Sequence, residues 1–124
     1  MAKEWTVFVL CAEWCGVCRA FQPACQSFVQ SNPEVGLYWI DIEDEADRLG
    51  SLEVETFPTI AIARGADPVF FGPMKPDMRQ VESLMNASQD KAWCSEEGRQ
   101  WVRYLMEAFA PQGDATRSRP PGTA

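Results

Sequence analysis

The sequence contains no histidine, and this absence excludes several classes of site. Ser-His-Asp and Cys-His nucleophile pairs, and zinc or haem sites with imidazole ligands, cannot form within this chain. Basic residues are also in the minority, with 11 Lys and Arg against 18 Asp and Glu, so the formal net charge is −7. A nucleic-acid-binding protein needs a cationic face for the phosphates, so this charge balance argues against that function.

Long hydrophobic runs are absent as well. The first apolar run spans only residues 5–11, whereas a membrane-spanning helix needs about 20 apolar residues. A signal peptide needs a longer apolar core than this, followed by a small-residue cleavage site. We therefore expect no targeting segment, no membrane contact and a reducing cytoplasmic location. In that compartment cysteines are expected to be free, metal-bound or catalytic rather than structural bridges.

The residues that are present suffice for one folded domain. The chain has 124 residues, of which 46% are hydrophobic, and this combination is typical of a single domain with its own core. We expect residues 1–110 to form that domain and to be monomeric. Residues 111–124 have no apolar periodicity, which is typical of a disordered tail.

Hydrophobic periodicity predicts alternating strands and helices. Residues 5–11 are continuously apolar, as in a strand that is buried on both faces. Residues 16–31 have apolar side chains at helical spacing, and this pattern predicts an inward face of Val17, Phe21, Ala24 and Phe28. Similar patterns predict strands at residues 35–42, 59–63 and 69–71, and helices at residues 43–49, 76–86 and 95–109. This order indicates an α/β fold with a mixed sheet of about four strands flanked by helices.

The most informative motif is Cys15-Gly16-Val17-Cys18, at the predicted junction of a strand and a helix. Residues three apart lie about one helical turn from each other, which is close enough for a disulfide. Cys15 precedes the first turn, where unpaired N–H groups and the helix dipole stabilise a thiolate. Cys18 lies further into the helix, is less accessible, and is suited to resolve a disulfide made by Cys15. The pattern therefore favours redox chemistry.

The chain has five cysteines, so they cannot all pair within one monomer. A zinc site with four thiolates is the alternative reading of the motif, but it needs two more convergent cysteines. The other three, Cys11, Cys25 and Cys94, are scattered along the chain. We expect Cys11 and Cys25 to be buried free thiols. Cys94 is expected to be exposed, with a regulatory or intermolecular role as the alternative.

The run Trp14 to Cys18 (WCGVC), followed by Phe57-Pro58-Thr59, resembles the thioredoxin family, whose members carry a WCGPC-type motif and a cis-proline before a threonine. The resemblance implies a thioredoxin-like fold and a thiol–disulfide oxidoreductase in which Cys15 is the nucleophile, Cys18 resolves, and the two form the redox disulfide. It implies substrate contacts at Trp14, Phe57, the cis-proline Pro58, Thr59 and Gly72. It also implies protein disulfides as substrates, an NADPH-dependent reductase as electron donor, a role in cell redox homeostasis, and no bound cofactor.

Three departures from the family pattern are visible. The buried Asp and its Lys partner, which thioredoxins usually contain, are replaced by Val9 and Trp39. Val17 stands in place of the motif proline, so a shifted redox potential is expected. The motif also comes early in the chain, which suggests that the strand and helix usually preceding it are missing. We expect the additional helix at residues 95–109 to cover the sheet face that this shortening leaves bare.

Two other functions stay open at this point. A thioredoxin-like binding adaptor with weak turnover is favoured by the absence of the Asp–Lys pair. A metal- or cluster-carrying protein that uses Cys15 and Cys18 across a dimer, as in glutaredoxins, is disfavoured by the thioredoxin form of Phe57-Pro58-Thr59.

Overall fold

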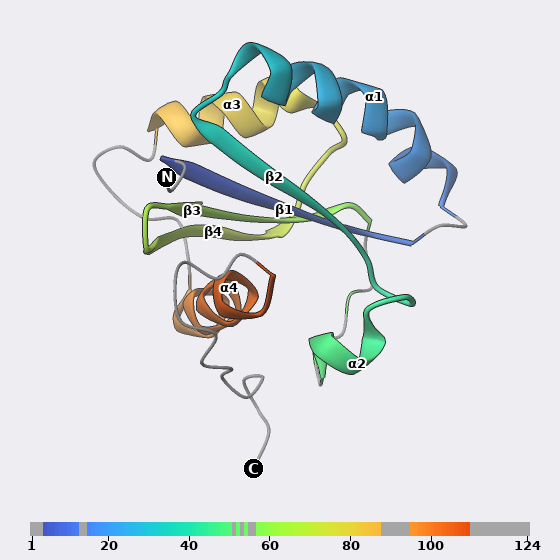
Figure 1. The fold of residues 1–124 in the computed structure, drawn as a ribbon, viewed down its shortest axis with the longest axis vertical. Helices are drawn as coiled ribbons and strands as arrows, with labels where there is room; N and C mark the ends of the chain where they lie inside the picture. The colour runs from blue at the N-terminus through green and yellow to red at the C-terminus, as the bar shows by residue number, and fades with distance from the viewer. Residues whose placement is uncertain are drawn as a thin grey trace.

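The computed structural model describes residues 4–12, 15–50, 52, 54, 57–87 and 95–109. Its core is a four-stranded sheet in the order β2-β1-β3-β4, with helices on both faces (Figure 1). The strands are β1 (Trp5–Cys11), β2 (Val35–Asp41), β3 (Thr59–Arg64) and β4 (Asp67–Pro73), and the helices are α1 (Gly16–Ser31), α2 (Ala46–Leu49), α3 (Met78–Ala87) and α4 (Glu96–Phe109). The predicted α/β fold with a mixed sheet is confirmed: β1 is parallel to β2, while β1–β3 and β3–β4 are antiparallel.

Strand β1 lies in the middle of the sheet, and every one of its residues is buried. Successive side chains of a strand point to opposite faces, so β1 contributes to two separate cores. Trp5, Val7, Val9 and Cys11 belong to the core between the sheet and helices α1 and α3. Phe8 and Leu10 belong to the core beneath α4. The continuous apolar run is therefore explained by burial on both faces.

Helix α1 covers the first face with Cys18, Phe21 and Cys25, which are its buried residues. The inward face predicted from the sequence is partly wrong, because Val17 is 48% exposed and Ala24 is exposed as well. The helix is rotated so that residues at 18, 21 and 25 meet the sheet, a spacing of three and four that suits one helical face equally well. Helix α3 lies beside α1 and closes the same core with Val81 and Met85.

Helix α4 packs on the opposite face of the sheet (Figure 1). Its side chains Val102 and Leu105 are fully buried against Phe8 and Leu10 of β1. The prediction that this helix covers the second face is thereby confirmed. Ser95 caps the helix, since its Oγ accepts a hydrogen bond from the Gly98 N–H at 3.1 Å.

Several helix and strand boundaries differ by a few residues from those predicted from the sequence. Strand β2 ends at Asp41, because its carboxylate accepts hydrogen bonds from the N–H groups of Glu43 and Asp44 and turns the chain. Helix α2 is consequently shorter than predicted, and it ends at Leu49, followed by its C-cap residue Gly50, where φ is 64°. Strand β4 is longer than predicted at both ends. The predicted tail and Cys94 lie outside the described residues.

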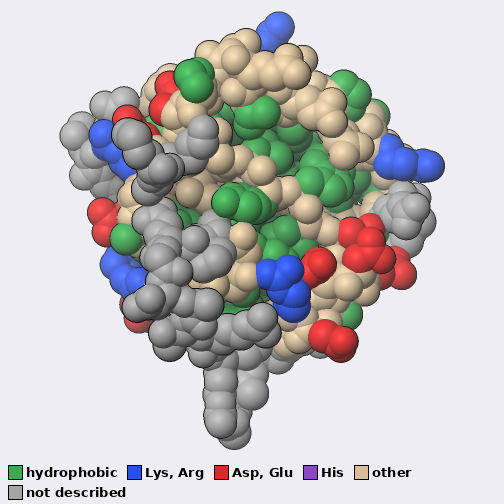
Figure 2. All heavy atoms as spheres, viewed as in Figure 1, with side chains coloured by type: hydrophobic (Ala, Val, Ile, Leu, Met, Phe, Trp, Pro, Cys, Tyr) green, Lys and Arg blue, Asp and Glu red, His purple; other side chains and the backbone are tan. Residues whose placement is uncertain are grey.

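One edge of the sheet is formed by β2, which faces the viewer in Figure 1. Figure 2, in the same view, shows hydrophobic side chains over the middle of this side of the molecule, with charged side chains next to them and at the outline. Tyr38 of β2 is 38% exposed and stacks on Phe8 with ring centroids 5.4 Å apart. Within the ranges that the structure describes, no helix has the length and hydrophobicity needed to cross a membrane.

Candidate active site

Cys15 stands immediately before α1 and is the N-cap residue of that helix. Its backbone is extended, with φ −84° and ψ 111°, its N–H donates to the Ala12 carbonyl at 2.9 Å, and its carbonyl accepts from the Arg19 N–H at 3.2 Å. The Cys15 side chain makes no capping hydrogen bond and is partly exposed. The first turn of α1 contains no acidic side chain that would repel an anion there. The Cys15 side chain is therefore accessible from outside and lies beside the unpaired N–H groups of a helix start.

Cys18 lies one turn further along α1 and is fully buried. It forms a disulfide with Cys11, the last residue of β1, with the two Cα atoms 5.9 Å apart. Cys15 is a free thiol. The prediction of a free thiol at Cys11 is therefore wrong, and the expected Cys15–Cys18 disulfide is not the one formed in this structure.

Strand geometry explains why Cys11 meets Cys18. Odd-numbered residues of β1 point to the face that α1 covers, so Cys11 follows Val7 and Val9 into the same core as Cys18. The Cys11 carbonyl also accepts from the Ile42 N–H at 2.9 Å, which ties the end of the strand to the segment after β2. The sequence contained this signal: the alternation of β1 directs Cys11 towards the helix that begins with the CxxC motif.

The loop before β3 supplies the other predicted site residues. The Phe57–Pro58 peptide bond is cis, as the family resemblance implies. Phe57 is half-buried and packs against the core that contains Cys18, with Cys15 packing against that core as well. Pro58 and Thr59 are buried, which leaves Phe57 as the one of these three with a partly exposed side chain.

The residue whose backbone pairs with Pro58 is Met74. The Met74 N–H donates to the Pro58 carbonyl at 3.2 Å, whereas Gly72 pairs with Ile60 further along the sheet. A Cβ built at Gly72 would lie 3.4 Å from the Phe70 ring, which is an ordinary van der Waals contact. The antiparallel register of β3 and β4 thus determines which residue faces the cis-proline, and sequence reasoning missed Met74. Trp14, the other predicted substrate contact, lies outside the described residues.

The structure thus combines a CxxC motif at the start of a helix with a cis-proline immediately before β3. The family model described as thioredoxin matches residues 2–85. The chain belongs to the thioredoxin family. Its members among solved structures include a thioredoxin of Fasciola hepatica, with TM-score 0.60 and 19% identity over 71% of this chain and 85% of that one. Thioredoxin O2 of Arabidopsis thaliana in its oxidised state has TM-score 0.55 and 26% identity, over 70% of this chain and 79% of that one.

Curated relatives agree with the family but match only part of their length. A putative thioredoxin 2 of Streptomyces coelicolor is 29% identical over 71 residues, which are 57% of this chain and 53% of the relative. Mitochondrial thioredoxin O2 of Arabidopsis thaliana is 32% identical over 62 residues, which are 48% of this chain and 39% of the relative. The chain thus spans about half the length of the curated relatives that it matches.

This thioredoxin-family chain lacks the family's buried Asp–Lys pair, and the structure shows what replaces it. Val9 of β1 and Trp39 of β2 are direct neighbours in the parallel register of the two strands. Val9 is fully buried and Trp39 is half-buried, so two apolar side chains pack where the family usually has two ionisable ones. No proton can be relayed through these positions, and proton transfer to Cys18 has to involve other groups or solvent.

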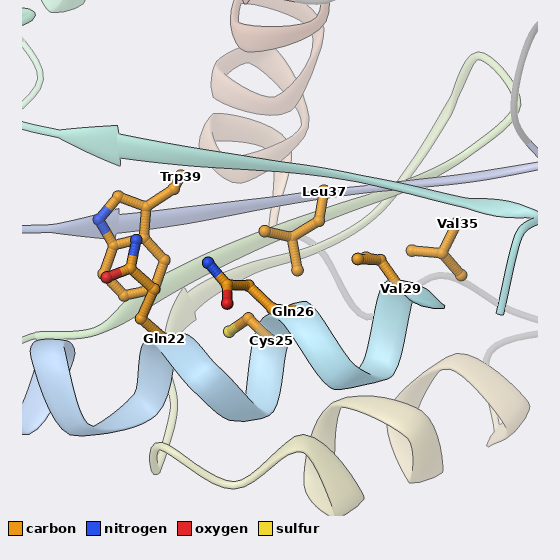
Figure 3. A pocket seen from close by; sticks show the side chains of 7 residues that line it. All are labelled: Gln22, Cys25, Gln26, Val29, Val35, Leu37 and Trp39. Carbon is orange, nitrogen blue, oxygen red and sulfur yellow. The ribbon is translucent and has the colours of Figure 1, made fainter. Parts of the chain in front are cut away.

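Cys25 lies on α1 two turns beyond Cys18 and is 1% exposed, which confirms that it is a buried free thiol. Its Sγ is 3.9 Å from the Met78 Sδ of α3. Burial raises the pKa of the Cys25 thiol to about 12. Figure 3 shows Cys25 next to Gln26 at the hollow that α1 forms with Trp39 and other residues of β2. Because the thiolate is disfavoured here, Cys25 is suited to packing and not to disulfide exchange.

Proposed function

We propose that this chain is a thiol–disulfide oxidoreductase that reduces or exchanges protein disulfides through Cys15 and Cys18. The observation that carries the proposal is the position of Cys15, partly exposed at the N-cap of α1, with Cys18 buried one turn behind it. An exposed thiolate attacks an external disulfide, and a buried thiol nearby is protected from external attack. This division of roles is what the two-cysteine reaction requires.

The reaction starts from the form in which all the cysteines are reduced. The Cys15 thiolate attacks one sulfur of the substrate disulfide, whose S–S bond breaks, and the other substrate sulfur leaves as a thiolate. The Cys18 thiolate then attacks the Cys15 sulfur of the mixed disulfide. The second substrate sulfur leaves as a thiolate, and a Cys15–Cys18 disulfide forms. The substrate disulfide has then gained two electrons, and the two cysteines have lost them. Reduction by an external dithiol system, by resemblance an NADPH-dependent reductase, regenerates the starting form.

Exposed apolar surface beside Cys15 supports a protein substrate. Val17 is 48% exposed within the motif itself, and Phe57 is partly exposed on the cis-proline loop. Both are uncharged, so they suit contact with an extended segment around a substrate disulfide. We further propose that the chain acts as a monomer in the reducing cytoplasm and contributes to cell redox homeostasis, with no tightly bound cofactor.

An insulin disulfide reduction assay with dithiothreitol as electron donor tests the function. Cys15→Ser is expected to lower the dithiothreitol-dependent turnover at least a hundredfold, because the attacking thiolate is lost. Cys25→Ser is the matched control, since Cys25 lies on the same helix and its thiol is not part of the reaction. Turnover by Cys15→Ser equal to that of the control variant would contradict the proposed function.

A binding adaptor with weak turnover is the second candidate, and the apolar Val9–Trp39 pair favours it. Restoring the family's ionisable residues with Val9→Asp and Trp39→Lys together distinguishes the two functions. If the native chain turns over only slowly and the double variant is faster, the adaptor is favoured. If the native chain reduces insulin at a thioredoxin-like rate, the adaptor function is excluded.

A further inference from the structure

Cys18 has two cysteines within the reach of a disulfide, and only one of them belongs to the CxxC motif. Cys15 is three residues away at the start of the same helix, about one turn distant. Cys11 is bonded to Cys18 in the structure, with a Cα separation of 5.9 Å that is ordinary for a disulfide. A single buried sulfur therefore lies between an accessible partner and an inaccessible one.

We propose that Cys11 is a third redox-active cysteine. It attacks Cys18 in the Cys15–Cys18 disulfide, forms a Cys11–Cys18 disulfide and releases Cys15 as a thiol. This inference rests on the proposed oxidoreductase function and deepens it. It assigns to Cys11 the role of a second, internal partner for the resolving cysteine.

The step is an internal thiol–disulfide exchange, so it needs no external oxidant or reductant. The Cys11 sulfur, as thiolate, attacks the Cys18 Sγ. The Cys15–Cys18 bond breaks, the Cys11–Cys18 bond forms, and Cys15 leaves as a thiolate that takes up the proton lost by Cys11. One disulfide and one thiol are present before and after, so the number of electrons is unchanged.

Backbone contacts position the two reacting residues, Cys11 and Cys18, independently of the disulfide between them. Cys11 is held at the end of β1 by sheet pairing and by the Ile42 N–H, which donates to its carbonyl at 2.9 Å. Cys18 is held within the first turns of α1, and both residues belong to one core. Exchange between groups that a fold positions in this way has a high effective concentration.

The exchange changes what an external thiol can reach. The Cys11–Cys18 disulfide is enclosed in the core, because the two residues are 1% and 0% exposed. A Cys15–Cys18 disulfide has a partly exposed sulfur at Cys15. Attack on a disulfide requires access to one of its sulfurs, so the internal form retains its oxidation longer. Meanwhile the Cys15 thiol is free to attack a further disulfide without a resolving partner.

Disulfide mapping of the full chain tests the assignment. The reduced protein is treated with an equimolar amount of insulin disulfide as the oxidant, so that no disulfide is left to react with the released Cys15, then quenched in acid, labelled with N-ethylmaleimide and analysed by mass spectrometry of its peptides. We expect the native protein to be labelled at Cys15 and bridged between Cys11 and Cys18, and Cys11→Ala to be bridged between Cys15 and Cys18. Cys15→Ser is expected to stay reduced at Cys11 and Cys18, because oxidation by insulin passes through Cys15.

The rate of re-reduction by dithiothreitol supplies a second readout. After oxidation, Cys11→Ala is expected to recover its thiols about tenfold faster than the native protein, because its disulfide is accessible. Cys25→Ala, which removes another buried thiol from the same core, is expected to match the native protein. A Cys15–Cys18 bridge with a labelled Cys11 in the native protein, or equal rates for native protein and Cys11→Ala, would overturn the role of Cys11. Neither of those results would contradict the proposed oxidoreductase function. That function is contradicted only if Cys15→Ser still reduces insulin.

Discussion

Leu105 provides a direct measure of how much α4 contributes to the stability of the domain. Its side chain is fully buried in the core between α4 and the sheet, whose other buried residues include Phe8, Leu10 and Ala61. Replacing a buried leucine by alanine removes transfer free energy and leaves a cavity, at a cost of about 2–5 kcal/mol. A domain of this size is typically stable by about 5–15 kcal/mol, so Leu105→Ala should lose a large part of the total.

Urea denaturation under reducing conditions measures the effect, with intrinsic tryptophan fluorescence as the signal. Slopes for small domains are about 1–3 kcal/mol per molar urea, so the midpoint should fall by roughly 1–3 M for a loss of 3 kcal/mol. Arg103→Ala is the matched control, because Arg103 lies on the same helix with an exposed side chain and alanine keeps the helix propensity. It should change the stability by no more than about 0.5 kcal/mol.

Truncation at Ala92 extends the same experiment to the whole helix. It removes all of the buried side chains of α4, namely Trp101, Val102, Tyr104 and Leu105, and exposes the apolar face of the sheet beneath them. We expect the shortened chain to be unfolded in the absence of urea. If the truncated protein melts like the full chain, or if Leu105→Ala is as stable as Arg103→Ala, then α4 does not form the second core and the explanation of the fold is wrong.

Two further predictions concern single side chains. Ser95→Ala removes the acceptor for the Gly98 N–H at the start of α4 and should cost about 0.5–2 kcal/mol in urea denaturation, while Ser95→Asp, which restores a capping acceptor, should recover most of it. The pKa of Cys25 is about 12 in the folded protein against 9.0 for an ordinary thiol, so the unfolded chain loses this proton first. Its contribution to stability is therefore complete below about pH 9 and is lost as the pH rises towards 12, by up to about 1.4 kcal/mol per pH unit. Cys25→Ala should show a shallower decline of stability between pH 9 and pH 11 than the native protein, and an identical decline would show that Cys25 is not protected from ionisation.

Much of the fold follows from local patterns in the sequence. The continuous apolar run at residues 5–11 predicts a central strand, because only a strand covered on both faces buries every side chain. The serine at 95, followed by two glutamates, correctly predicts the start of α4, since capping depends on residues that are adjacent in the chain. The cis peptide bond at Pro58 came from the family resemblance and is not evident from composition.

Other features depend on contacts between distant parts of the chain. The rotation of α1, which exposes Val17 and buries Cys18, is decided by how the helix meets the sheet. The register of β3 and β4 places Met74 beside Pro58, and no local pattern indicates that pairing. The structure therefore contains the predicted nucleophile position and the predicted cis-proline loop, together with Met74, which was not predicted.

The cysteines separate most clearly what the local sequence determines from what contacts between distant parts of the chain determine. The local sequence by itself predicts that Cys15 stands immediately before the helix and that Cys18 follows one turn later, because both positions are set by consecutive residues around the motif. The bond between Cys11 and Cys18 was decided by the tertiary structure. It requires both the alternation of side chains along β1 and the packing of α1 across that strand, and a disulfide forms only where such packing brings two sulfurs together.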